Sequence, residues 1–329
     1  MIVDKNTPIT NSLSLLSKAS FVIHCQSRKD VVDADNFAKK EGLPLITLGE
    51  GTNIIPNNHI DRVVLILDFD ALKIENETVV AEAGNKWDRV VQFAVNNDLS
   101  GIEALSWIPG KTGAAPVQNI GAYGSEFSDV TDKVEVYNRE KEEFVMLTNK
   151  ECQFGYRNSI FKKYPDKFII VSMTLKLSEE NLKIPKYKDI ENYFSERRND
   201  NPSLREIREA IIKVRKSKLP NPETIPNVGS YFTNPVIENE KALNVKKKFP
   251  DMPSFDFENK TKIPAGWLIE QAGLKGKKIG KVEIYSKNAL ILINPSQANF
   301  TDIMEAEKFI QNKVFQKFNI LLKREPVII

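Results

Sequence analysis

Two glycine-rich stretches of this 329-residue chain carry residues that could bind an anion. The longer one, residues 101–124, holds five of the fifteen glycines and two prolines, so its backbone is bent and little covered by side chains. The shorter one, Leu48-Gly-Glu-Gly-Thr-Asn53, directly follows the apolar residues 44–48, which indicate a strand. Amides in such turns can donate to phosphate oxygens, and α/β proteins bind ligands where strands end. Either stretch alone could be an ordinary surface loop, but the two together suggest a ligand with two phosphates.

Three polar residues outside these stretches could take part in a reaction. Ser230 follows Gly229 in an irregular segment with several prolines, where a serine is most often a turn residue. To act as a proton donor, it would need a companion residue that compensates the charge left on its oxygen. Arg157 lies within residues 154–159, whose aromatic and glycine residues suit a pocket wall, although it could also be a surface charge. A guanidinium in such a wall could stabilise an oxyanion. Glu325, by its position alone, indicates an exposed carboxylate.

The composition argues against several other kinds of site. Cys25 and Cys152 are the only cysteines, and His24 and His59 are the only histidines. That is too little material for a clustered metal site, a haem ligand pair or a Ser/His/Asp triad, so we predict no metal and two reduced thiols. The pattern G-x-G-x-x-G is also missing, which argues against a Rossmann nicotinamide enzyme.

Charge and hydropathy limit the partners. The balance of 47 Lys and Arg to 44 Asp and Glu is too even for a nucleic-acid binder. The basic turn at residues 275–281 has no interleaved aromatic residues that could stack on bases. Residues 1–20 do not resemble a signal peptide, and the longest apolar runs are only a few residues long. We expect a soluble, cytoplasmic monomer with no membrane partner.

The first part of the chain predicts a βαβ unit. Strands are expected at residues 21–25 and 44–48, joined by a helix over residues 29–40 that Ser27 caps and Gly42 ends. A strand at residues 62–69 and a hairpin at residues 72–80 follow. Asn85 is then expected to cap a helix. Its apolar residues recur at helical spacing and should form the face that packs into the core: Trp87, Val90, Val91, Ala94 and Val95.

The remainder alternates strands and helices. Strands are expected at residues 133–137 and 144–148, and the alternation over residues 169–177 predicts a strand buried on one face. An amphipathic helix follows Pro202, and its basic end at residues 213–218 indicates a solvated helix terminus. Helices are also expected from Pro264 to Ile269, stopped by Gly273, and over residues 301–318.

The two glycine-rich stretches resemble those of a known family. Ile108-Pro-Gly-Lys-Thr-Gly-Ala-Ala-Pro-Val-Gln-Asn-Ile-Gly-Ala-Tyr-Gly124, preceded by Leu48-Gly-Glu-Gly-Thr-Asn53, closely resembles the UDP-N-acetylenolpyruvoylglucosamine reductases, also called UDP-N-acetylmuramate dehydrogenases. These are FAD enzymes of peptidoglycan precursor synthesis. Further matching segments are Glu151-Cys-Gln-Phe-Gly-Tyr-Arg157-Asn-Ser, Lys218-Leu-Pro, Gly229-Ser230 with Asn234-Pro, Ala265-Gly-Trp-Leu-Ile269 and Glu325.

The resemblance implies an α+β fold of three parts. It implies an FAD-binding fold of the vanillyl-alcohol-oxidase (PCMH) type in two subdomains, followed by a C-terminal α+β substrate-binding domain. Residues 1–68 would form the first subdomain, joined by the tail at residues 319–329. Residues 69–215 would form the second subdomain, and residues 216–318 the substrate-binding domain.

The resemblance also implies which residues bind and react. The expected FAD-binding residues are Gly49, Glu50, Gly51, Thr52, Asn53, Gly110, Gly113, Ala114, Ala115, Pro116, Gln118, Asn119 and Ile120. The expected substrate-binding residues are Tyr187, Lys218, Asn234, Lys275 and Asn288, with Tyr187 on a loop typical of the first type of these reductases. Ser230 would be the proton donor, and Arg157 and Glu325 would stabilise an enolate-like charge.

The reaction implied in this way has two halves that share one site. NADPH first reduces FAD, and hydride then passes from flavin N5 to C3 of the enolpyruvyl ether of UDP-N-acetylglucosamine while Ser230 protonates C2. The product would be UDP-N-acetylmuramate. Two alternatives stay open at this point: an FAD oxidase of the same fold acting on another substrate, and a UDP-sugar-binding protein without redox chemistry.

Overall fold

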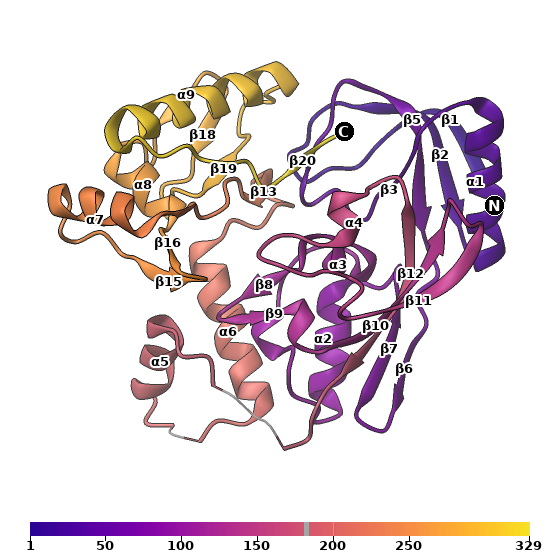
Figure 1. Cartoon of the computed structure of the whole chain (residues 1–329), viewed down its shortest axis with the longest axis horizontal. Helices are drawn as coiled ribbons and strands as arrows, with labels where there is room; N and C mark the ends of the chain where they lie inside the picture. The colour runs from indigo at the N-terminus through magenta and orange to yellow at the C-terminus, as the bar shows by residue number, and fades with distance from the viewer. Residues whose placement is uncertain (181–183, 200) are drawn as a thin grey trace. The chain divides into compact units, whose positions relative to one another are not determined.

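The structure, a computed structural model, describes residues 1–180, 184–199 and 201–329. Its internal contacts divide the chain into two units. Unit 1 comprises Met1–Pro8, Lys18–Gly51 and Ile60–Ser217, and unit 2 comprises Ile9–Ser17, Thr52–His59 and Lys218–Ile329. Figure 1 follows the chain through its elements by colour. The finer division into two FAD-binding subdomains and a third domain stays a prediction.

Unit 1 opens with a four-stranded sheet and one helix. The strands are β1 (Ile2–Pro8), β2 (Lys18–Cys25), β5 (His59–Leu67) and β3 (Leu45–Thr47), in that order across the sheet. Helix α1 (Arg28–Glu41) begins after Ser27, whose side chain accepts a hydrogen bond from the Asp30 amide, and ends at Gly42 in the left-handed conformation. The predicted βαβ unit is confirmed, including both helix caps.

A five-stranded antiparallel sheet follows in unit 1. Its order is β11 (Glu143–Thr148), β10 (Thr131–Asn138), β12 (Phe168–Lys176), β7 (Thr78–Glu82) and β6 (Leu72–Glu75). Helix α2 (Trp87–Asn96) shares one hydrophobic core with β7, β10 and β12, and α1 shares another with β2, β5 and residues of β10 and β12. The central strands of the larger sheet can be followed together with α2 in Figure 1.

Strand β12 is buried on both faces, so the prediction of burial on one face is wrong. Ile169 and Val171 lie in the core with α1, whereas Met173 lies in the core with α2. The pairing of β12 with β10 shifts register at this point, so that one residue of β12 has no partner across the ladder. Because a bulge of this kind turns the following side chains to the opposite face, a strictly alternating sequence serves two cores.

Helix α2 also begins differently from the prediction. Its N-cap is Lys86, which makes no side-chain capping bond. The Asn85 amide nitrogen instead donates to the carbonyls of Ala71 and Glu82, and its oxygen accepts from Arg89. The prediction that Asn85 caps this helix is wrong, because its side chain holds the end of the preceding hairpin.

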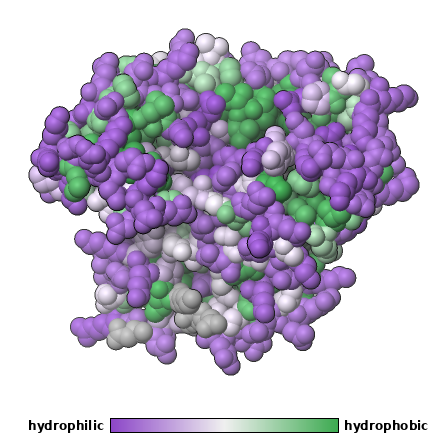
Figure 2. Space-filling model, in the orientation of Figure 1, coloured by the Kyte–Doolittle hydropathy of each residue, from purple (hydrophilic) through white to green (hydrophobic). Residues whose placement is uncertain are grey.

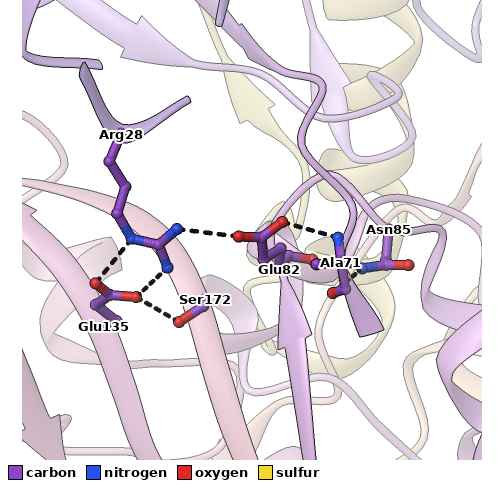
Figure 3. A network of polar contacts seen from close by, with 6 residues as sticks. All are labelled: Arg28, Ala71, Glu82, Asn85, Glu135 and Ser172. Carbon is purple, nitrogen blue, oxygen red and sulfur yellow. Dashed lines mark hydrogen bonds and ion pairs between the residues drawn. The ribbon is translucent and has the colours of Figure 1, made fainter. Parts of the chain in front are cut away.

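A polar network joins α1 to the larger sheet (Figure 3). Arg28 donates to both oxygens of Glu135, at 3.0 and 2.5 Å, and to Glu82 at 3.0 Å. Glu135 also accepts from the Ser172 hydroxyl at 2.7 Å, and the second oxygen of Glu82 accepts from the Ala71 amide at 2.8 Å. The network lowers the pKa of Glu135, chiefly through the hydrogen bonds from Arg28. It therefore joins β7, β10 and β12 to the start of α1.

Two further helices complete unit 1. Helices α5 (Lys188–Ser195) and α6 (Leu204–Lys218) share a small core that includes Ile190, Phe194, Ile207 and Ile211. The helix predicted after Pro202 is therefore confirmed. The remaining regular elements are η1 (Glu103–Leu105), η2 (Thr112–Ala114), α3 (Ala115–Gln118), β8 (Gly121–Ala122), β9 (Ser125–Glu126), η3 (Phe127–Asp129) and α4 (Ile160–Lys163).

Unit 2 combines small sheets with three helices around its own core. Its sheets are β13 (Asn227–Ser230), β19 (Ile291–Ile293), β18 (Val282–Ile284) and β17 (Lys278–Ile279); β14 (Val236–Ile237), β16 (Lys260–Lys262) and β15 (Phe255–Phe257); and the parallel pair β20 (Val327–Ile328) and β4 (Ile54–Ile55). The helices are α7 (Asn239–Lys248), α8 (Ala265–Gln271) and α9 (Phe300–Phe318). The predicted helices from residue 264 and over 301–318 are thus confirmed.

Both cysteines are buried within unit 1. Cys25 lies at the end of β2 and Cys152 in the loop after β11, and the side chains are fully enclosed. Burial raises the pKa of each thiol to about 12. Since the thiolate is the reactive form, both thiols are inert at neutral pH.

On the face drawn in Figure 2, hydrophilic residues dominate and hydrophobic ones gather in small groups. Of the helices in the described ranges, none combines the length and the apolar character that a bilayer crossing requires.

Candidate active site

The two glycine-rich turns predicted to bind pyrophosphate lie against each other within unit 1. The Glu50 carboxylate in the first turn accepts a hydrogen bond from the Gly110 amide in the second, at 3.1 Å. A methyl group added at Gly49 would lie 3.4 Å from Cβ of Lys111 and 3.9 Å from Cβ of Ala114. The first turn follows β3. The amide of Leu48, the residue after β3, donates a hydrogen bond to the Leu65 carbonyl of β5. The strand end and the longer glycine segment therefore form one surface.

The second turn is fixed by its own amides. Thr112 donates to the Asn85 carbonyl, and Gly113 donates to the Ala83 carbonyl. An added Cβ at Gly113 would lie only 2.8 Å from Cβ of Ala83, so only glycine allows this close approach. The Ala83 amide in turn donates to the Val171 carbonyl in the bulge of β12. The bulge and the turn are thus parts of one backbone arrangement.

Lys111 holds the same turn from the other side. Its ammonium group donates to the Leu67 carbonyl at 2.7 Å and to Asp68 at 3.2 Å. Asp68 also contacts His24 through Nδ1 at 2.6 Å. These hydrogen bonds and charges lower the pKa of Asp68, against an opposing effect of burial. The carboxylate therefore stays charged and keeps the lysine at the base of the turn.

The segment after the second turn leads to Arg157. Helix α3 contains Ala115, Pro116 and Gln118, whose side-chain oxygen accepts from Lys162, and it is followed by Asn119 in the left-handed conformation. The buried Asn119 side chain donates to Glu126 and the Gly155 carbonyl and accepts from the Ser128 amide. The Arg157 guanidinium donates to the Gly121 carbonyl at 3.0 Å. Arg157 and the loop that carries Gln118, Asn119 and Ile120 are therefore one structural group.

Tyr187 lies beside the end of this same segment. It is 46% exposed, precedes α5, and meets the Tyr123 ring edge to face with ring centres 5.3 Å apart. Gly124 lies beneath it, because a Cβ there would be 3.8 Å from the Tyr187 ring. Unit 1 thus brings together the predicted cofactor turns Gly49–Gly51 and Gly110–Ala115. It also brings Arg157 and Tyr187 to the loop at residues 118–124.

Unit 2 brings Ser230 and Glu325 together. Ser230 ends β13, opposite Ile291, and is half-buried. The next residue, Tyr231, accepts at its carbonyl a hydrogen bond from the Glu325 amide at 2.9 Å. Phe232 and Arg324 also pair as an antiparallel bridge. Residues that lie about a hundred positions apart in the sequence are therefore backbone neighbours, which sequence spacing alone could not reveal.

Two buried side chains hold this pairing. The Tyr231 hydroxyl donates to Glu307 of α9 at 2.8 Å, and Arg324 donates to the same carboxylate oxygen at 2.9 Å. Burial raises the pKa of Tyr231, and the Glu307 charge raises it further, so this hydroxyl acts as a permanent donor. The backbone on either side of Ser230 and Glu325 is fixed to α9 by these contacts.

The other predicted residues of unit 2 lie around α8 and the neighbouring loops. Asn234 accepts from the Ala265 amide at the start of α8, and the Asn288 oxygen would lie 4.0 Å from a Cβ at Gly266. Lys275 pairs with Glu270 at 2.9 Å. The Asn53 carbonyl accepts from Val327 at the β4–β20 pairing, and Thr52 and Lys218 are the first residues of their segments in this unit.

The residues of unit 1 suit the binding of a dinucleotide pyrophosphate. The two turns meet, a side chain at Gly113 is sterically excluded, and the buried Thr112 hydroxyl has no hydrogen-bond partner in the described part of the chain. A buried hydroxyl without a partner is costly, and a ligand oxygen beside it would remove that cost. The amides of Thr112 and Gly113 already serve the turn itself, so further donors would come from the first turn and from this hydroxyl.

Comparison with known proteins identifies the family. Residues 19–146 match the family described as FAD binding domain, and residues 221–329 match that described as UDP-N-acetylenolpyruvoylglucosamine reductase, C-terminal domain. The chain is 36% identical to the UDP-N-acetylenolpyruvoylglucosamine reductase of Flavobacterium johnsoniae, over 97% of this chain and 96% of that relative. The chain belongs to the UDP-N-acetylenolpyruvoylglucosamine reductase family. It is 36% identical to the reductase of the same name from Aliivibrio fischeri as well, over 99% of this chain and 93% of that relative.

A solved structure of the reductase family supports the fold. The UDP-N-acetylenolpyruvylglucosamine reductase of Thermus caldophilus matches with a TM-score of 0.68, covering 97% of this chain and 95% of that one at 22% identity. The predicted α+β fold, an FAD-binding part of the vanillyl-alcohol-oxidase (PCMH) type followed by a C-terminal α+β domain, is confirmed. As a member of this reductase family, the chain is a flavoprotein oxidoreductase.

Proposed function

We propose that the protein reduces the enolpyruvyl ether of UDP-N-acetylglucosamine to UDP-N-acetylmuramate, a step of peptidoglycan precursor synthesis, with FAD as cofactor and NADPH as reductant. The similarity to reductases of this name over nearly the whole chain supports the activity. The meeting of the two turns and the buried Thr112 hydroxyl support the cofactor, because this hydroxyl has no hydrogen-bond partner among the described residues and a phosphate oxygen beside it would supply one. When bound, FAD would supply the hydride chemistry that no side chain can perform.

The residues of the chain would bind, orient and protonate. The turns at Gly49–Asn53 and Gly110–Ala115, with Pro116, would hold the pyrophosphate, and Gln118, Asn119 and Ile120 would border the ring system. Because the Asn119 side chain is already bonded within the protein, its contribution would come from its backbone.

Three side chains would take part in catalysis. Ser230 would deliver a proton to C2 of the substrate. The positive charge of Arg157 would compensate the enolate-like negative charge that develops there, and Glu325 would stabilise it as a hydrogen-bond donor in its protonated form. The hydrogen bond that the Glu325 amide donates to the Tyr231 carbonyl supports this assignment, since it keeps Ser230 and Glu325 on adjacent backbone segments. NADPH and the nucleotide substrate would use one site in turn, which requires ping-pong kinetics.

Substrate binding would involve charged and aromatic side chains. Lys218 and Lys275 would act as point charges toward the diphosphate, and Asn234 and Asn288 would donate or accept hydrogen bonds to the uracil or sugar. Tyr187, which is exposed and beside Tyr123, would cover the nucleotide as in the tyrosine-loop type of these reductases. Monomeric state and cytoplasmic location stay predictions.

The test separates the two half-reactions. We expect the purified protein to show a flavin spectrum that NADPH bleaches without oxygen, and that recovers when the enolpyruvyl nucleotide is added. In Ser230→Ala the bleaching should proceed at nearly the parent rate, while the recovery slows by ~10²–10⁴-fold, the usual contribution of a general acid. The exposed Ser286→Ala in the same unit is the control. Equal slowing of both half-reactions by Ser230→Ala would remove the serine from proton transfer, and recovery with oxygen alone would point to an oxidase.

A further inference from the structure

One ammonium group joins the predicted catalytic arginine to the loop that is predicted to border the ring system of the cofactor. Lys162 lies in the short helix α4, and its Nζ atom donates to the Arg157 carbonyl and to the side-chain oxygen of Gln118, at 3.0 Å each. Both hydrogen bonds are partly buried. Because hydrogen bonds from a charged donor are stronger than those between neutral groups, Lys162 holds both acceptors in place.

Arg157 needs such support, because its backbone conformation is unusual. Its φ of +52° lies in the left-handed region, which residues with a side chain rarely adopt. It occupies a tight turn in which the amides of Gly155 and Asn158 each donate to the carbonyl of the other, at 3.0 Å. A left-handed residue of this kind persists where the surrounding contacts fix it. The hydrogen bond from Lys162 is such a contact, and it acts on the peptide group that directly follows the strained residue.

The position of Lys162 is fixed in turn by the start of α4. The Ser159 hydroxyl, which caps this helix, accepts from the Lys162 amide at 3.2 Å and donates to the Val117 carbonyl of α3 at 2.8 Å. Helices α3 and α4 lie side by side, as can be followed in Figure 1. Lys162 therefore extends its ammonium group from a helix that is itself bonded to the segment carrying Gln118.

These contacts hold Arg157 at both of its ends. Its guanidinium group donates to the Gly121 carbonyl at 3.0 Å, and its own carbonyl is joined to Gln118 through Lys162. Both ends are thus tied to the loop at residues 118–121. Since the guanidinium group projects from the backbone that Lys162 supports, loss of the ammonium group would change where the guanidinium group lies.

We propose that Lys162 is a positioning residue of the reaction, which sets through the Arg157 carbonyl the place where the Arg157 guanidinium group meets the substrate. The inference deepens the proposed function and rests on it, because it takes Arg157 as the group that stabilises the enolate-like charge. A catalytic group displaced by about 1 Å can lose a factor of about 100 in rate. A lysine can therefore control the rate through the arginine alone.

The test follows the two half-reactions of the FAD-loaded enzyme. In Lys162→Met we expect NADPH to reduce the flavin at nearly the parent rate, and the enolpyruvyl nucleotide to reoxidise it about 10- to 100-fold more slowly. The loss should lie in the rate at saturating nucleotide and not in the concentration at half saturation, because Arg157 would act on charge that develops in the transition state. Lys163 is an exposed lysine of the same helix, so Lys163→Met is the matched control and should behave like the parent.

A double-mutant cycle separates positioning from a direct action of the lysine. If Lys162 acts through Arg157, then Lys162→Met should slow reoxidation by less than about twofold in an Arg157→Met background. Equal slowing in both backgrounds would show that the lysine acts on its own, and would overturn the inference. Reoxidation of the single variant Lys162→Met at the parent rate would overturn it as well.

The FAD content of the variants shows whether the fold is kept. If Lys162→Met does not retain FAD, Lys162→Gln takes its place in the same cycle with the same outcomes, because its side chain stays polar but is one atom shorter and uncharged.

Rescue by a restored ammonium group completes the test. Lys162→Cys alkylated with bromoethylamine regains an ammonium group at the length of lysine, and the enclosed Cys25 and Cys152 stay unmodified. Recovery of the reoxidation rate after complete alkylation, checked by mass, supports the inference, and failure to recover overturns it. Failure of the parent enzyme itself to be reoxidised by the enolpyruvyl nucleotide would instead refute the proposed function, so the two failures can be told apart.

Discussion

The Arg28 network gives the sharpest prediction on the stability of unit 1. Arg28→Met would remove three hydrogen bonds and leave Glu82 and Glu135 without their cation. Their side chains are only 18% and 16% exposed, whereas Arg28 is 39% exposed. A solvent-exposed ion pair is worth ~0.2–1 kcal/mol, and breaking a fully buried one costs ~3–5 kcal/mol. Since these exposures fall between the two cases, and Ser172 and the Ala71 amide still serve the carboxylates, we expect a loss of ~2 kcal/mol.

The assay can isolate unit 1. Trp87 and Trp107 lie in unit 1 and Trp267 in unit 2, so tryptophan emission in a Trp267→Phe background reports on unit 1 alone. Urea unfolding followed in this way should give a lower midpoint for Arg28→Met with an unchanged slope. Lys29→Met is a matched control, because Lys29 is 82% exposed and pairs with Asp33 in the next turn of α1, so its midpoint should not move.

Acid dependence provides a second reading of the same variant. Arg28 lowers the pKa of Glu135, so the stability that this carboxylate contributes is present above its ordinary value of 4.5 and is lost as the pH falls through the lower value of the folded protein. The difference between parent and Arg28→Met should therefore be constant near neutral pH and shrink below about pH 4.5. A loss below 0.5 kcal/mol at pH 7, or a difference that does not diminish in acid, would refute the reasoning, since ~0.5 kcal/mol is the level of an ordinary surface substitution.

Two further substitutions test the site. Gly113→Ala should lower the free energy of unfolding by ~1–3 kcal/mol and lower the FAD content, because its Cβ would lie 2.8 Å from that of Ala83. Gly49→Ala, whose nearest contact would be at 3.4 Å, should keep the parent's stability in urea unfolding. Equal stabilities of the two variants would contradict the packing argument. Glu307→Gln should lower the stability of unit 2 by ~1–3 kcal/mol, because Arg324 loses its buried anion and Tyr231 its charged acceptor. Trp267 emission would measure it, and a midpoint equal to that of the parent would show that the pairing near Ser230 does not depend on Glu307.

Local signals in the sequence predicted much of the fold. Ser27 and Gly42 fixed the ends of α1 because a cap and a left-handed glycine act within one turn of the helix. Asn85 failed as a cap because its partners lie in the preceding hairpin, and a cap position competes with any nearby carbonyl. The burial of β12 on both faces depends on a bulge, and a bulge leaves no trace in an alternating pattern.

The site was only partly accessible to sequence reasoning. The glycine turns could be found by composition, but the Glu50 contact that joins them needs the fold, as does the pairing of Glu325 with Tyr231. The basic run at residues 213–218 predicted a solvated helix end, but Arg215 within it is partly buried and its Nε atom is enclosed, which its basic neighbours concealed.

The enclosed thiols of Cys25 and Cys152 have a practical consequence for following the enzyme at work. With both pKa values near 12, neither sulfur should react with a maleimide dye at neutral pH. A cysteine introduced at an exposed position such as Lys186 would then be the sole labelled atom. A fluorophore there, on the residue that precedes Tyr187, could report nucleotide arrival in real time without first rebuilding the protein as a cysteine-free variant.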